Sequence, residues 1–161
     1  MPRYERSFVV LLLAVLSVGC GGEGLQIHAR AAMVTGAVLG QAGELLVQAR
    51  GDALDGVVVR TEGMPREDRL ATLVAAEAAW QPAIVAYEGA RLALVAWIES
   101  ISLANAAGGD EDVMGHVVAM VGRLLGSWDP FAASMRALGV DIPALPDALR
   151  DLALVLGGGD D

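Results

Sequence analysis

The chain has 161 residues, 55% of them apolar, with 11 basic and 20 acidic side chains and a formal net charge of −9. This acidic balance argues against nucleic-acid binding, which needs basic patches, and against electrostatic attraction to anionic lipid headgroups. A single cysteine excludes any disulfide within the chain.

The first residues have the pattern of a secretory signal peptide. Arg3 and Arg6 lie in a short polar start, an apolar run covers residues 8–18, and the small residue Gly19 precedes Cys20. This order of a basic region, an apolar region and a small residue at a cleavage site is typical of such peptides. The apolar run is too short to cross a bilayer, which takes about 20 residues. We therefore expect cleavage between Gly19 and Cys20.

The segment Leu16-Ser17-Val18-Gly19-Cys20 resembles the lipobox of bacterial lipoproteins, with Ser17 where that family prefers Leu. The resemblance implies that the Cys20 sulfur receives a diacylglyceryl group, that the peptide is cut before Cys20, and that the new amine is acylated. It also implies a cell-envelope location, in enteric-type bacteria the outer membrane, on the side facing the periplasm. The alternative is an ordinary cleaved signal peptide in which Cys20 plays no part.

We expect four segments in the domain organisation. Residues 1–19 form the leader, residues 20–24 the lipidated cysteine and a short tether, residues 25–156 a single helical domain, and residues 157–161 a frayed acidic tail. The mature length fits one domain. The short tether is expected to hold the domain close to the membrane.

The spacing of apolar and small residues predicts a first helix over residues 25–50. One stripe recurs at intervals of three and four residues, as one face of a helix requires: Leu25, Ala29, Ala32, Gly36, Leu39, Gly43 and Leu46. A glycine inside a helix costs about 1 kcal/mol relative to alanine. We therefore expect a partner helix to approach closely at Gly36, Gly40 and Gly43. Residues 54–59 either extend this helix after a kink or form a loop on the core.

Residues 66–106 predict a second, long helix. Pro65 suits the first helical position, and Glu67 and Asp68 suit the first turn. Pro82 predicts a kink near residues 78–81. Small residues on one side are expected to face the first helix and form an antiparallel hairpin with near axes: Ala71, Ala75, Ala79, Ala86, Ala90, Ala93, Trp97 and Ala104.

Three shorter helices are expected to cover this hairpin. Asp110 is the predicted N-cap of the first of them, which ends near residue 125 because Gly126 stops it. Asp129 and Pro130 begin the next, which ends at Gly139, and residues 147–156 form the last. The sequence thus predicts an all-α, four-helix-bundle-like fold.

Three glutamates of the second long helix share one side. Glu77, Glu88 and Glu99 are spaced by eleven residues, about three turns, and lie about 16 Å apart along the axis, too far to share one ion. They are interpreted as a solvated stripe or a partner surface. The only histidines, His28 and His116, belong to no metal-binding motif. We expect no metal, no cofactor and no catalytic site.

The tryptophans are the remaining candidates for a binding surface. Trp97 is expected to pack inside the hairpin, and Trp80 to point toward its edge beside the kink. Trp128 is expected at a helix junction, where it closes the end of the core or touches the membrane interface. Trp80 and Trp128 therefore join the three glutamates as a candidate interaction surface. For each tryptophan, the alternative is packing in the core.

The function most compatible with these features is non-catalytic. The sequence indicates a lipid-anchored envelope protein whose helical domain contacts another envelope component or a second copy of itself. One alternative is a carrier that holds a small apolar ligand in the bundle, near Pro82 and Trp97. Another is a phage-encoded lipoprotein acting in lysis or superinfection exclusion.

Overall fold

The computed structural model describes residues 23–151. The expected cleavage and lipidation site at Gly19 and Cys20, and the expected tail at 157–161, lie outside these residues. The described part is built from α2 (Glu23–Arg60), α3 (Arg66–Ala78), α4 (Gln81–Ala106) and α5 (Glu111–Ala137). A further helical turn begins at residue 147, and no strand occurs in this range. The all-α fold class is confirmed.

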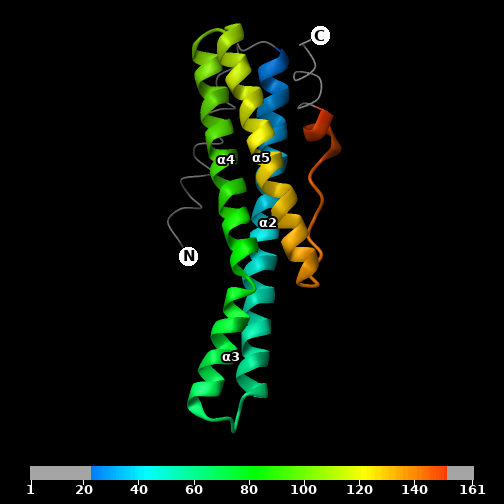
Figure 1. Cartoon of the computed structure of the whole chain (residues 1–161). Coiled ribbons are helices and arrows are strands. Elements are labelled where there is room, and N and C mark those ends of the chain that lie inside the picture. The colour runs from blue at the N-terminus through cyan, green and yellow to red at the C-terminus, as the bar shows by residue number, and fades with distance from the viewer. Residues whose placement is uncertain (1–22, 152–161) are drawn as a thin grey trace, which may run out of the picture.

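The helices form a long bundle in which α2, α4 and α5 lie together at one end, and α2 and α3 pair at the other (Figure 1). α2 runs the whole length, and α3 and α4 return along it in the opposite direction. α5 packs antiparallel on α4 and ends before the level of α3, so α2 and α3 form a bare hairpin at that end. After α5 the chain doubles back beside it.

A heptad seam holds the three-helix part together. The buried residues of α2 alternate at spacings of three and four: Leu25, His28, Ala32, Thr35, Leu39, Ala42 and Leu46. The core residues of α4 and α5 follow the same rhythm: Ala83, Tyr87, Ala90, Leu94, Trp97, Ile101 and Ala104 on α4, and Val117, Val121, Leu124, Trp128, Phe131 and Met135 on α5. A repeat of seven is the pattern of left-handed coiled-coil packing.

The first helix is longer than the range 25–50 expected from the sequence. α2 continues without a break through residues 51–59 to Arg60, giving 38 residues and a length of about 57 Å. Just after its end, the buried Thr61 donates its hydroxyl to the Val57 carbonyl at 2.8 Å. Gly63 then turns the chain with a φ of 90°, which only glycine adopts freely.

The kink expected at Pro82 is present. α3 ends at Ala78 and α4 begins at Gln81, with Pro82 in its first turn. At the junction, the Trp80 amide donates to the Glu77 carbonyl at 3.1 Å, a tighter turn than an α-helix makes. Because proline supplies no amide and its ring crowds the preceding turn, Pro82 favours a break in the helix here.

Two expected helices are one continuous helix. Gly126 does not stop α5, and Pro130 lies inside α5 rather than at the start of a new helix. The buried stripe from Val117 to Met135 crosses both residues without a change of rhythm. Packing of this stripe outweighs the local cost of Gly126 and Pro130. The expected stop at Gly139 is confirmed, with a φ of 77°.

The close approach expected at the α2 glycines occurs at Gly43 and not at Gly40. A side chain at Gly43 would overlap the Tyr87 hydroxyl, whereas Gly40 faces open space. Tyr87 in turn packs on Phe131 of α5 with ring centroids 5.4 Å apart. Gly43 thus admits an aromatic side chain from α4, and bulky residues rather than alanines fill this part of the core.

Candidate interaction surface

Glu77 is engaged in a salt bridge between α3 and α2. Its carboxylate accepts two hydrogen bonds from Arg50, one of them from Nε at 3.0 Å. The side chains are 40% and 34% exposed, respectively, for Arg50 and Glu77. The hydrogen bond to Glu77 raises the pKa of Arg50. Among residues 23–151, this is the only salt bridge between α2 and α3.

Glu88 and Glu99 lie on the solvent side of α4. Glu88 pairs with Arg91 one turn later, at 3.2 Å and with both side chains about half exposed. Such an exposed pair contributes between 0 and about 1 kcal/mol to stability. Glu99 is exposed. These two residues fit the interpretation of a solvated stripe.

Trp80 and Trp128 do not lie on a surface. They are 5% and 3% exposed, and both belong to the core. Trp128 packs edge-on against Phe131 at 5.4 Å. The sequence-based placement of both at an interaction surface is therefore corrected: Trp80 closes the core at the kink, and Trp128 lies within the continuous helix α5. Trp97, 0% exposed, packs in the core as expected.

Three buried polar atoms have no hydrogen-bond partner among the described residues. They are His28 Nδ1, Thr35 Oγ1 and Trp97 Nε1. His28 meets the Trp97 ring edge-on at 6.0 Å, and burial lowers the pKa of His28. The sequence stripe through Ala29 and Gly36 missed His28 and Thr35. The series Leu25, His28, Ala32, Thr35 and Leu39 also follows a spacing of three and four residues. This second series could have predicted that His28 and Thr35 are buried.

Apolar side chains gather instead on one side of the hairpin end. On α2, Val47 and Val58 are 70% and 38% exposed, and they are separated by eleven residues, which places them on one side of the helix. Gly40 and Gly51 lie on the same side, and neither has a neighbour within 4 Å of the position of a Cβ atom. On α3, Leu70 and Val74 are each 61% exposed and lie one turn apart.

The Arg50–Glu77 salt bridge shows that these two stripes share one side of the hairpin. Arg50 lies one turn after Val47 on α2, and Glu77 lies one turn after Val74 on α3. Because the salt bridge joins the helices on the side where its two residues point, the flanking apolar residues lie there as well. We call this surface the hairpin face; it comprises Gly40, Val47, Arg50, Gly51, Val58, Leu70, Val74 and Glu77.

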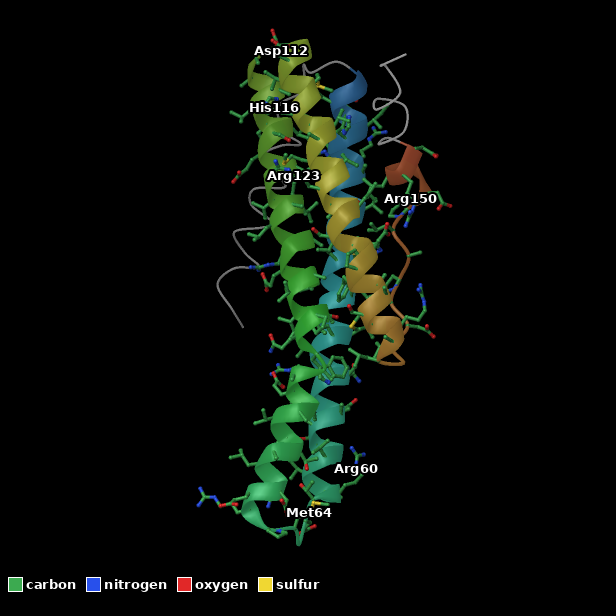
Figure 2. The ribbon with its side chains drawn as sticks, viewed as in Figure 1. Arg60, Met64, Asp112, His116, Arg123 and Arg150 are labelled. Carbon is green, nitrogen blue, oxygen red and sulfur yellow. The ribbon has the colours of Figure 1, made fainter. Side chains whose placement is uncertain are left out.

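The hairpin face lies far from the other end of the bundle. Figure 2 shows Arg60 and Met64 at the hairpin tip, and Asp112 and His116 at the opposite end. His116 is exposed, and its Nδ1 lies 3.1 Å from the Asp112 carbonyl oxygen of its own helix. Within residues 23–151 no three side chains of His, Cys, Asp or Glu converge on a point where a metal would bind. None of the helices in this range is both long and apolar enough to span a bilayer.

Comparison with known proteins gives no family. No family model matches the chain, and neither a curated protein nor a solved structure is significantly similar to it. Function is therefore inferred from the residues themselves: the expected leader over residues 1–19, Cys20 after it, and the hairpin face.

Proposed function

We propose that the chain is a lipid-anchored protein of the bacterial cell envelope whose helical domain acts through protein contacts and not through catalysis. The observation that carries this proposal is Cys20, the only cysteine, at the end of a segment that resembles a lipobox. α2 begins three residues later, at Glu23. Lipid on Cys20 would thus hold the start of α2 next to the membrane.

With its first turn held at the membrane, α2 would act as a spacer. A helix of 38 residues is about 57 Å long. If its first turn is held at the bilayer, the hairpin tip near Gly63 can reach tens of ångströms away from the lipid surface. The exposed valines and the leucine of the hairpin face support a role in protein contact, since apolar side chains grouped on a surface mark interaction sites.

Membrane fractionation and fatty-acid labelling test the anchor. In bacteria that express the full chain and take up labelled palmitate, we expect the protein to carry label and to sediment with the membranes. Density-gradient separation is expected to place it with the outer membrane. Cys20→Ser should abolish the label and release the chain from the membrane fraction.

A second substitution in the same segment serves as the matched control for Cys20→Ser. Ser17→Leu restores the residue preferred by the lipobox family and should leave labelling intact. An unlabelled wild-type chain, or Cys20→Ser protein that keeps the label, would overturn the proposal. A palmitate-labelled chain found in the inner membrane would retain the anchor and reject the outer-membrane location.

A further inference from the structure

The hairpin end lacks the third helix that covers the rest of the bundle. α3 has no buried residue, and α5 does not reach its level (Figure 1). Most helical stability in proteins comes from packing an apolar face against another element. On α3, Leu70 and Val74 have no such element among residues 23–151, since both are 61% exposed. A further surface that covers the hairpin face would supply the missing packing.

We propose that the hairpin face binds the same face of a second copy of this chain, so that two hairpins form a four-helix bundle. The two-fold axis runs parallel to the hairpin. From Arg50 to Val58, α2 of each copy lies on α3 of the other, and from Gly40 to Arg50 it lies on the start of α4. The proposal rests on the protein-contact role proposed above and names its partner, but it does not depend on lipid at Cys20.

The positions of Arg50 and Glu77 favour an axis parallel to the hairpin over a perpendicular one. Arg50 lies on α2 and Glu77 lies level with it on α3, joined by their salt bridge. A two-fold axis parallel to the hairpin brings Arg50 of each copy opposite Glu77 of the other, so that opposite charges meet. An axis perpendicular to the hairpin at this level brings Arg50 opposite Arg50 and Glu77 opposite Glu77. Like charges facing one another oppose association.

The apolar residues match in the same arrangement. Val58 lies eight residues beyond Arg50 on α2, and Leu70 lies seven residues before Glu77 on the antiparallel helix α3. At 1.5 Å per residue the two are level to within about 2 Å. Val58 of each copy therefore meets Leu70 of the other. Both copies point the same way, so their α2 helices begin at the same end of the dimer.

Two glycines of α2 suit a close approach at this face. Gly40 and Gly51 are inside a helix, where each costs about 1 kcal/mol relative to alanine. Neither has an atom of this chain near the position of a Cβ, so packing within the chain does not account for them. A helix of the second copy that rests on this stripe would use the space that a side chain would otherwise take.

The area of the hairpin face meets the lower limit for a biological interface. The stripe from Gly40 to Val58 spans 18 residues of α2. At 1.5 Å per residue it is about 27 Å long, and two helices side by side are about 20 Å wide. Two such faces bury about 1,100 Å² together, just above the roughly 1,000 Å² expected of a biological interface.

Charge reversal tests the proposal with the full chain in a mild detergent, and native mass spectrometry at micromolar concentration gives the readout. The wild type is expected to be a dimer. Arg50→Glu alone and Glu77→Arg alone each place like charges opposite one another and should be monomers. An equimolar mixture of these two variants should form a 1:1 heterodimer, because each new charge then meets its opposite.

The double variant Arg50→Glu/Glu77→Arg tests the direction of the axis. With the axis parallel to the hairpin, it should dimerise with itself as the wild type does and fail to pair with the wild type. With the perpendicular axis, it would instead pair with the wild type. That second result would overturn the proposed arrangement.

Glutamate substitutions at two exposed apolar positions, one on the hairpin face and one outside it, provide the matched comparison. Leu70→Glu places a charge on the hairpin face and should weaken the dimer about tenfold or more. Val34→Glu, at a 52% exposed position on another side of α2, should leave it unchanged. Circular dichroism of each variant checks that the helices remain, as expected for exposed sites.

A wild-type monomer, or single charge variants that dimerise like the wild type, would overturn the proposal. A wild-type monomer recovered together with a different protein on the hairpin face would do the same. None of these results bears on palmitate labelling of Cys20, so a failed dimer and a failed anchor are distinguishable.

Discussion

His28 is a histidine without a compensating charge in the core of the bundle. It is 2% exposed, its Nδ1 has no partner among the described residues, and its nearest ring is that of Trp97. Burial penalises the charged imidazolium and so lowers the pKa of His28 from 6.5 in the folded chain. The unfolded chain therefore takes up a proton at a higher pH than the folded chain does.

This difference predicts a loss of stability in mild acid. Above pH 6.5 both states hold a neutral His28, so the pH has no effect through this residue. As the pH falls below 6.5, protonation favours the unfolded chain by at most about 1.4 kcal/mol per pH unit. Thermal unfolding between pH 7.5 and 5.5 should show a falling midpoint in the wild type. The slope should shrink in His28→Leu and persist in His116→Leu, because His116 is exposed.

Thr35 offers a second test of the polar core. Its hydroxyl is fully buried one heptad after His28 and has no hydrogen-bond partner among residues 23–151. Valine has almost the same shape and no hydroxyl to desolvate. Thr35→Val should therefore raise the free energy of unfolding by about 1 kcal/mol, as measured by urea titration. A decrease would show that the hydroxyl is hydrogen-bonded in solution.

At the scale of single helices, the local signals and the packing disagree most clearly in α5. The sequence correctly predicted the stop at Gly139, the kink at Pro82 and the cap at Asp110, whose carboxylate accepts from the Asp112 amide at 3.0 Å. These features depend on residues close in the chain. Gly126 and Pro130 are equally strong local signals, yet the helix passes through both. The buried stripe that overrides them becomes decisive only when α4 is present as its partner.

The cost of keeping Pro130 inside α5 can be measured. Proline in a helix interior lacks the amide that would donate to the carbonyl of Gly126, and its side chain is exposed, so it adds little packing. Pro130→Ala should restore the hydrogen bond and stabilise the fold by about 1–2 kcal/mol, after a loss of up to about 1 kcal/mol from the freer unfolded chain. Chemical unfolding monitored by circular dichroism is the measurement. Destabilisation would mean that the bend at Pro130 is needed for packing.

The candidate surface was harder to predict than the helices. Trp80 and Trp128 looked like surface residues because each lies beside a helix-breaking signal. In the structure, the turn at Trp80 is tight and the signal beside Trp128 is overridden, so both rings are buried. Ala71 and Ala75 were expected to face α2 and are exposed. Glu77, expected on the opposite side of the helix, faces α2 instead. Its pairing with Arg50, 27 residues earlier, depends on the register of the hairpin, which local spacing does not define.

At the scale of the whole molecule, helix length and net charge affect how two copies can associate. α2 alone is 38 residues long, and the bundle changes from three helices to two along it. The chain carries a net charge of −9, so association through the hairpin face has to overcome a general repulsion between copies. Salt screens this repulsion. The same dimer should therefore form at lower protein concentration as salt rises, as native mass spectrometry over a dilution series would measure.

The central claim is that Cys20 joins this helical domain to a membrane, and the intact mass of the chain purified from bacterial membranes tests it most directly. The account predicts a chain that begins at Cys20 and carries the added mass of a diacylglyceryl group, with or without a further acyl group on its amine. A chain with a free thiol at position 20, or one that keeps residues 1–19, would contradict it.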